Sequence, residues 1–311
     1  MTTVTPYRIS GHESFPCRYT WLPKAVRGLD NDTRLFSDAD EAMVELGLGK
    51  NMVRSARFWA QVAGMINPLA KGAGYEPSAF GRALLGPDGC DPFLEDIRTL
   101  WLIHWKLSTN KQNPLLAWDY LLNRWQEPDL VHSAALAALE KEAARQEGSL
   151  SRVTIEQHLD TFLHTYVPTR GRKGEVLEDN LDSPLVELEL LIKVGDRTGA
   201  QSEPIYAFRR EEKPEITPEL FLYCLNEFWN SRHSNDKTLA FREVAHGHGS
   251  PGQIFKLPEE DVRARVESLK HQTGGDLDYS DAANQQQLHR ARLRDPAELL
   301  AAIYGREEAN A

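Results

Sequence analysis

One short stretch of the sequence, GHESFPCRYTWLPKAV from Gly11, brings several kinds of reactive side chain together. His12 and Glu13 are a base and a carboxylate, the two kinds of group that acid–base catalysis uses. The zinc-protease motif H-E-x-x-H requires a second histidine four residues after the first, and Pro16 occupies that position. Catalysis by His12 and Glu13 is therefore one interpretation of this stretch, and a surface that docks a ligand is the other.

The cations of the same stretch favour the docking interpretation. Arg18 carries a planar fork of donors that matches the oxygens of a phosphate, and Lys24 adds a second positive charge. Cys17 would act as a nucleophile only beside a general base, so we expect it to be a small packing residue. Tyr19 and Trp21 are expected to pack beneath Arg18 or to stack on a nucleic-acid base.

A helix-turn-helix pattern follows, and it is the strongest local signal in the chain. Residues 38–46 show helical periodicity with Ser37 as the expected N-cap, and Gly47 ends this helix. A Gly-Leu-Gly turn leads into a second predicted helix over 51–65. Cationic and polar side chains recur at spacings of 4, 3 and 4 residues on one face of that helix, namely Lys50, Arg54, Arg57 and Gln61.

The local charge around this second helix is opposite in sign to that of the whole chain. The formal net charge of −10 argues against a non-specific DNA coat, yet residues 47–82 contain five cations and one acid. Residues 70–78 are expected to form a hairpin or wing beside the helix. We therefore predict DNA contact rather than a merely solvated basic face. The predicted DNA-binding residues are Arg18, Lys24, Lys50, Asn51, Arg54, Arg57, Gln61 and Lys71.

Two clusters contain residues that can ligate a metal. Glu178, Asp179 and Asp182 could hold Mg²⁺ or Mn²⁺, although carboxylates also favour the N-terminus of a helix, and a helix is predicted from about residue 185. The helix cap is the better supported interpretation. His246 and His248 lie in the loop HGHGSPG without an evident third ligand, and this loop could equally be the turn of a second helix-turn-helix.

Length and periodicity set the expected architecture. With 311 residues, 41% of them hydrophobic, the chain is long enough for two domains. We predict a mainly α fold with small β wings, in which tandem winged-helix-like domains are joined by a helical middle region. The predicted parts are an N-terminal winged helix-turn-helix domain over 1–110, a helical middle region over 111–168, a linker or loop over 169–183 and a second winged-helix-like domain over 184–311.

Composition also indicates where the protein works. No apolar run approaches the roughly 20 residues that span a bilayer, and the N-terminus lacks the basic and apolar regions of a secretion signal. The three cysteines, Cys17, Cys90 and Cys224, match neither a disulfide framework nor a zinc pattern. We therefore expect a cytoplasmic protein with reduced thiols that contacts no membrane.

Longer stretches of the sequence resemble a known bacterial family. The stretches GHESFPCRYTWLPKAV, LGLGKNMVRSARFWAQVAGMI, DPFLEDIRTLWLIHW, EDNLDSPLVEL and SPGQIFKL are similar to segments of SspB-like proteins, which sit in DNA phosphorothioation gene clusters. The resemblance extends from about Ser10 to Tyr304. The resemblance does not assign a catalytic role to any particular residue of this chain.

This resemblance implies a DNA-binding and DNA-nicking subunit of a phosphorothioate modification and antiphage defence system. Such a subunit would work beside a cysteine desulfurase, an ATPase and a sulfurtransferase. Whether the chain is itself an enzyme, a metal-dependent nicking endonuclease, stays open. The alternatives are a non-catalytic winged-helix module that positions DNA for the sulfurtransferase, a transcriptional regulator, or a protein-interaction scaffold. A homodimer also stays open.

Overall fold

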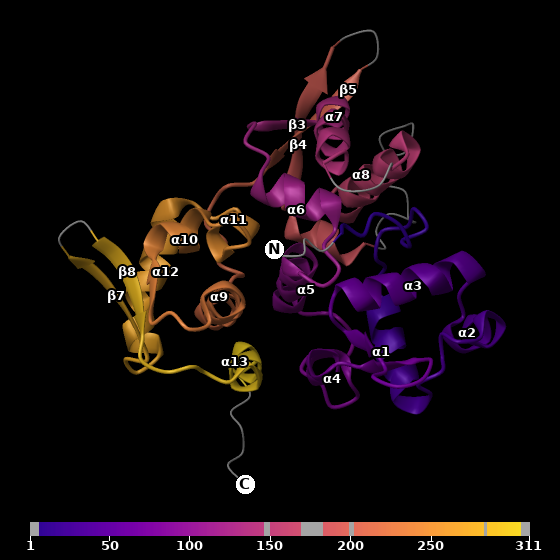
Figure 1. The fold of residues 1–311 in the computed structure, drawn as a ribbon, viewed down its shortest axis with the longest axis horizontal. Coiled ribbons are helices and arrows are strands. Elements are labelled where there is room, and N and C mark those ends of the chain that lie inside the picture. The colour runs from indigo at the N-terminus through magenta and orange to yellow at the C-terminus, as the bar shows by residue number, and fades with distance from the viewer. Residues whose placement is uncertain (1–5, 146–149, 169–182, 199–201, 283–284, 306–311) are drawn as a thin grey trace. The chain divides into compact units, whose positions relative to one another are not determined.

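The computed structural model describes residues 6–145, 150–168, 183–198, 202–282 and 285–305. The chain folds into two compact units (Figure 1): unit 1 is Met1–Leu121 with Trp125–Phe208, and unit 2 is Leu122–Arg124 with Arg209–Ala311. Helices predominate among the described residues, and their sheets are small and antiparallel. The prediction of a mainly α protein with small β elements is confirmed. The predicted boundaries at 110, 168 and 183 all lie inside unit 1, and the four-part division stays a prediction.

The first part of unit 1 contains the predicted pair of helices. Helix α2 (Ala39–Leu46) and helix α3 (Lys50–Val62) flank a turn in which Gly47 has a φ of 63°. This left-handed conformation is easily adopted by glycine, which lacks a Cβ. The hairpin of β1 (Ile66–Pro68) and β2 (Tyr75–Pro77) follows α3 directly. The predicted hairpin is therefore present, and its first strand begins before residue 70.

The N-cap of α2 is one residue later than predicted. The carboxylate of Asp38 accepts hydrogen bonds from the backbone N–H groups of Asp40 and Glu41, at 2.8 and 3.2 Å. A carboxylate at this position also interacts favourably with the positive end of the helix dipole. The prediction of Ser37 as the cap is wrong because Asp38 satisfies two N–H groups at once.

Helix α1 (Trp21–Asn31) begins inside the stretch GHESFPCRYTWLPKAV and was not predicted. Pro23 falls in its first turn, where the missing N–H costs no hydrogen bond. Helix α1 packs against α3, and Trp21, Leu22 and Val26 are buried there. The sequence predicts a short helix over residues 79–85, and helix α4 (Ala79–Leu85) has these bounds and begins after the cap Ser78.

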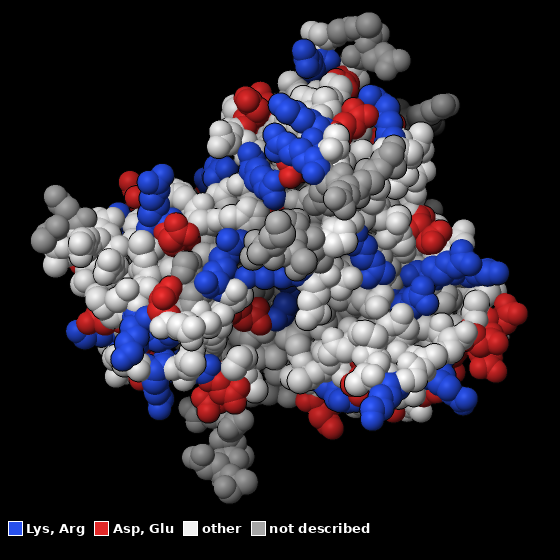
Figure 2. All heavy atoms as spheres, in the orientation of Figure 1, with Lys and Arg blue, Asp and Glu red and all other residues white. Residues whose placement is uncertain are grey.

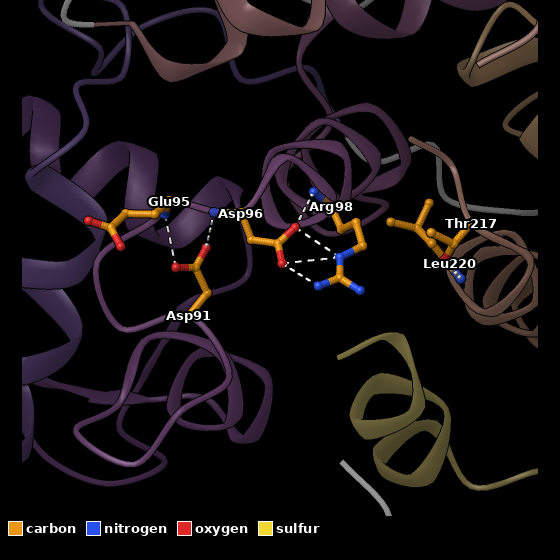
Figure 3. A network of polar contacts seen from close by, with 6 residues as sticks. All are labelled: Asp91, Glu95, Asp96, Arg98, Thr217 and Leu220. Atoms are coloured by element: carbon orange, nitrogen blue, oxygen red, sulfur yellow. Dashed lines mark hydrogen bonds and ion pairs between the residues drawn. The ribbon is translucent and has the colours of Figure 1, made fainter. Parts of the chain in front are cut away.

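The apolar run over residues 91–107 predicts a single helix, but helix α5 (Ile97–Thr109) begins later. Figure 3 shows the reason: the Asp91 carboxylate accepts from the backbone N–H groups of Glu95 and Asp96, at 2.9 and 3.0 Å, and so closes a separate turn. Asp96 then caps α5 through the N–H of Arg98 at 2.8 Å. The two aspartates divide one predicted helix into a turn and a shorter helix.

The rest of unit 1 is built around a three-stranded sheet. In chain order it comprises α6 (Leu116–Asn123), β3 (Asp129–Val131), α7 (His132–Ala143), α8 (Arg152–Tyr166), a 3-10 helix (Pro184–Leu188), β4 (Leu191–Arg197) and β5 (Glu203–Phe208), and the last residues of α6 belong to unit 2. The strand order is β3-β5-β4. Trp118, Phe162 and Tyr166 pack together in the core, where His104 Nδ1 lies 2.8 Å from the Tyr166 hydroxyl. From its position among Trp101, Ile103 and Trp105, His104 is predicted to be buried and hydrogen-bonded, and the structure confirms this.

Unit 2 is built around a second three-stranded sheet. It comprises α9 (Pro218–His233), β6 (Thr238–Ala240), α10 (Phe241–His246), α11 (Pro251–Ile254), α12 (Glu259–Gln272), β7 (Leu277–Ala282), β8 (Gln285–Arg290) and α13 (Pro296–Ile303). The strand order is β6-β8-β7. The sequence predicts a helix from Pro218, and α9 begins there because Thr217 caps it by accepting from Leu220 N–H at 3.3 Å (Figure 3).

The two three-stranded sheets share one order of elements. In each, a helix is followed by a strand, then by further helices, then by two strands, of which the last lies between the other two. The central strand of each sheet is antiparallel to its two neighbours: β5 pairs with β3 and β4, and β8 pairs with β6 and β7. None of the helices in the described ranges combines the length and the apolar character that crossing a bilayer requires.

Candidate nucleic-acid interface

Helix α3 has one packed face and one charged face. Val53, Ala56, Trp59 and Ala60 are buried, whereas Lys50, Asn51 and Arg54 are exposed and Arg57 and Gln61 are half-exposed. Figure 2 shows lysine and arginine side chains gathered over α3 and acidic side chains over neighbouring α2. Within the described part of the chain, no carboxylate forms an ion pair with a cation of α3. Its positive charge is therefore available to an external anion.

The other predicted DNA-binding residues lie on neighbouring elements of unit 1. Lys24 Nζ donates to the backbone carbonyl of Leu46 at 2.7 Å, which places its charge at the C-terminus of α2 beside the turn. Arg18 stacks on Trp21 and Phe15, with 5.5 and 5.8 Å from Cζ to the ring centroids. Lys71 is exposed in the loop of the β1–β2 hairpin. The prediction that aromatic rings pack against Arg18 is confirmed for Trp21.

Arg8 is a cation of this surface that the sequence did not single out. Its guanidinium lies over the ring of Phe58, 4.5 Å from Cζ to the centroid, and Nη2 donates to Oε1 of Gln61 at 3.2 Å. A second donor, Nη1, reaches Oδ1 of Asn113 at 3.5 Å. These partners are far away in sequence, so only the fold brings Arg8 to α3.

The turn that presents Glu13 is held against α3 by backbone contacts. The carbonyl of His12 accepts from Ser55 Oγ at 2.9 Å, and the carbonyl of Phe15 accepts from Trp59 Nε1 at 3.0 Å. Glu13 and Ser14 have φ values of 50° and 62°, which non-glycine residues rarely adopt. The side chain of Glu13 is exposed. A carboxylate is thus fixed on a strained turn that packs on the basic helix.

His12, by contrast, lies inside the protein, with 4% of its surface exposed. Its Nδ1 accepts from the backbone N–H of Ser14 at 3.1 Å, and its Nε2 lies 3.2 Å from Nδ1 of His158. Nε2 of His158 accepts from Ala117 N–H at 3.2 Å. Burial lowers the pKa of His12 to about 4 and that of His158 to about 3, the latter with help from His12. Both imidazoles are therefore neutral at pH 7, and their geometry braces the Glu13 turn.

The remaining candidates are the predicted metal ligands. Glu178, Asp179 and Asp182 lie outside the described residues, and no group of three or more His, Cys, Asp or Glu among those described could hold a metal ion. His246 Nε2 lies 2.8 Å from Oε2 of Glu259, whereas His248 Nδ1 accepts from Arg232 Nη2 at 2.7 Å. The two histidines thus have separate partners.

Cys17 is buried and its thiol Sγ lies 3.8 Å from the carbonyl of Arg18. Burial raises the pKa of the Cys17 thiol well above its usual range, so the reactive thiolate is strongly disfavoured. The prediction that Cys17 is a packing residue is confirmed.

Helices α8 and α12 are comparable to α3 in one respect: each precedes a pair of strands, β4 and β5 after α8 and β7 and β8 after α12. In helix α8, residues on successive turns are buried, among them Ile155, Leu159 and Phe162. Helix α12 begins with Glu259, Glu260 and Asp261. Its arginines are engaged internally: Arg265 pairs with Asp261 at 3.1 Å, and Arg263 Nη1 donates to the hydroxyl of Tyr279 at 2.8 Å. Neither helix presents the free cationic face that α3 does.

The chain belongs to the family described as Protein of unknown function (DUF4007), which matches residues 9–304. Its fold is similar to that of SspB: a magnesium ion-bound SspB crystal structure has 25% sequence identity, a TM-score of 0.81, and coverage of 94% of this chain and 85% of that chain. A second SspB crystal structure has 24% identity, a TM-score of 0.79 and the same coverage. No curated protein matches the chain. The resemblance to SspB-like proteins is confirmed.

Proposed function

We propose that this chain is the DNA-binding subunit of a bacterial DNA phosphorothioation system and that it nicks one strand of the bound duplex. The family match and the similarity to SspB support the phosphorothioation context. The observation that carries DNA binding is the face of α3, where Lys50, Arg54 and Arg57 have no carboxylate partner in the described chain. Such a face is what phosphates and base edges require of a recognition helix.

The interface is best described as a winged helix-turn-helix. Helix α2, the glycine turn and α3 supply the helix pair, and the β1–β2 hairpin supplies the wing with Lys71 in its loop. The shared element order of the two three-stranded sheets supports two further winged-helix-like modules. Burial of α8 and the acidic first turn of α12 leave α3 as the DNA-reading helix.

Within this proposal, Glu13 is the candidate catalytic carboxylate and His12 is its positioning residue. Glu13 is exposed on a turn fixed to α3, where a bound phosphodiester would lie. His12 supplies an acceptor to Ser14 N–H and a carbonyl to Ser55, and so holds the turn in its strained conformation. A carboxylate in this place can accept a proton from the attacking nucleophile.

Mg²⁺ or Mn²⁺ is the proposed cofactor, and the magnesium ion-bound SspB structure supports testing these ions first. The described residues near α3 do not form a three-ligand group, so no step of the reaction is assigned to a metal. The proposed partners are the ATPase, the sulfurtransferase and the cysteine desulfurase of the same system, with the nicked strand passing to the sulfurtransferase.

A non-catalytic module that positions DNA is the second candidate. The observation that favours it is that Glu13 belongs to no group of three or more described His, Cys, Asp or Glu residues that could hold a metal ion. In this case the same α3 face binds DNA, and the Glu13 turn is a docking edge.

A supercoiled-plasmid assay separates the two candidates. Wild type, Glu13→Gln and Glu95→Gln, an exposed-surface control in unit 1, are incubated with plasmid in Mg²⁺, in Mn²⁺ and in EDTA, and DNA binding is measured on the same samples. The nickase proposal expects open-circular product from wild type and the control, and binding without cutting from Glu13→Gln. Equal cutting by all three proteins would remove Glu13 from the site, and binding without cutting by any preparation would leave the positioning module.

A further inference from the structure

Arg8 is held in one place against the C-terminal half of α3. Its stacking on Phe58 and its hydrogen bond to Gln61 fix the guanidinium. Its backbone N–H donates to the carbonyl of Pro114 at 2.8 Å, which anchors the N-terminal segment. A guanidinium fixed in this way loses little conformational freedom when it binds a ligand.

Arg57 places a second guanidinium on the same surface. Residues 57 and 61 are one turn apart on one face of α3, and Arg8 is bonded to the second of them. Arg57 lies over the ring of Tyr75 in the wing, 5.9 Å from Cζ to the centroid. Burial lowers the pKa of Arg8, and the charge of Arg57 lowers it further while Tyr75 opposes this. The two cations therefore interact, as their shared neighbours indicate.

This pair has no anion to balance it within the described chain. The described acceptors of Arg8 are the neutral side-chain oxygens of Gln61 and Asn113, and no described carboxylate forms an ion pair with Arg8 or Arg57. Two partly desolvated like charges are unfavourable unless an anion joins them. Guanidinium groups retain several N–H donors beyond those used here, and two forks suit the two non-bridging oxygens of a phosphodiester.

We propose that Arg8 and Arg57 together bind one backbone phosphate of a DNA strand that lies along α3 next to the wing. The proposal rests on the proposed DNA-binding function and adds to it a phosphate site in which the N-terminal segment takes part. It has a quantitative consequence, because the two arginines share a single phosphate. Each phosphate that is neutralised contributes about 0.9 to the slope of log K against log salt for duplex DNA.

The test measures duplex binding by fluorescence anisotropy over a range of KCl concentrations. The proteins are wild type, Arg8→Met, Arg57→Met, the Arg8→Met/Arg57→Met double variant and an Arg8→Met/Arg54→Ala double variant. Methionine keeps an apolar stem over Phe58 or Tyr75 while it removes the charge, and thermal unfolding verifies that each variant is folded. Arg34→Ala, which removes an exposed cation paired with Asp32, is the control.

A shared phosphate predicts that Arg8→Met/Arg57→Met lowers the slope by about 0.9 in total. Arg8→Met/Arg54→Ala, which involves two different phosphates, is expected to lower the slope by more than Arg8→Met does. Slopes equal to wild type in Arg8→Met and in Arg8→Met/Arg57→Met, with a lower slope in Arg8→Met/Arg54→Ala, would overturn the phosphate site and leave the proposed function standing. A slope that falls by about 1.8 in the Arg8→Met/Arg57→Met variant would show that the two arginines bind separate phosphates and would contradict the shared site. Wild type that binds no duplex contradicts the proposed function itself.

Inorganic phosphate distinguishes a DNA phosphate from a free anion. If the site is built for the DNA backbone, millimolar phosphate competes no better than the same ionic strength of KCl. Phosphate that stabilises wild type but not Arg8→Met in the absence of DNA would contradict the DNA assignment and identify a free-anion site.

Discussion

His12 and His158 are two imidazoles in contact inside unit 1, and their protonation links stability to pH. In an unfolded chain the pKa of a histidine is about 6.5, whereas burial lowers the pKa of His12 to about 4 and that of His158 to about 3. Between about pH 6.5 and pH 4 the unfolded chain therefore binds protons that the folded chain does not. The free energy of unfolding is retained in full above this window and falls as the pH falls through it.

We predict that His158→Phe makes this loss of stability shallower. The variant is less stable than wild type at pH 7, because Ala117 N–H loses its acceptor. One titrating group fewer lowers the slope between pH 6.5 and pH 4.5 by up to about 1.4 kcal/mol per pH unit. Urea unfolding at several pH values measures it, with His164→Phe, an exposed residue of the same helix, as the control. Identical slopes for wild type and His158→Phe would show that the buried pair does not titrate in this way.

At the scale of the element, the capping of α2 decides how the helix pair begins. Asp38→Ala removes the acceptor of two backbone N–H groups and is expected to lower the free energy of unfolding by about 1 kcal/mol. Ser37→Ala is the matched control, since Ser37 makes no described side-chain cap, and it is expected to change stability by less than about 0.5 kcal/mol. Chemical denaturation of both variants makes the comparison. A larger loss from Ser37→Ala than from Asp38→Ala would contradict the observed cap.

Local signals predicted several elements of the fold and missed others. The glycine turn, the periodicity of α3 and the first residues of α4 and α9 are set locally, and each of these features lies where expected. Helix α1 was not predicted, although its buried residues Leu22, Val26 and Leu29 recur at helical spacing. The split at Asp91 was missed because a run of apolar residues does not reveal which carboxylate closes a turn.

The candidate site shows the same division. The cationic face of α3 could be predicted from spacing alone. Arg8 could not, since its partners Gln61 and Asn113 lie 53 and 105 residues away in sequence. His12 and His158 are 146 residues apart in sequence. That His12 is a buried residue supporting the Glu13 turn, and not an exposed base, could therefore be seen only in the fold.

At the scale of the whole molecule, the distribution of charge matters more than its sum. The chain carries a net charge of −10, yet the cations of α3 form no ion pair with a carboxylate among the residues that the structure describes. Exposed cations of unit 2 are paired, such as Lys270 with Asp278 and Arg292 with Asp276. An acidic protein of this kind is expected to bind DNA through one local surface, with an affinity that falls steeply with salt.

The most direct measurement compares duplex binding by two variants that remove the same charge from different places. Lys50→Ala/Arg54→Ala removes two unpaired cations from α3, and Lys270→Ala/Arg292→Ala removes two exposed cations from unit 2. We predict that the first variant loses about tenfold or more in affinity and about 1.8 in salt slope, because phosphate contacts disappear. The second is expected to bind like wild type. Equal losses in both variants, or none in the first, would contradict the assignment of α3 as the DNA-reading helix.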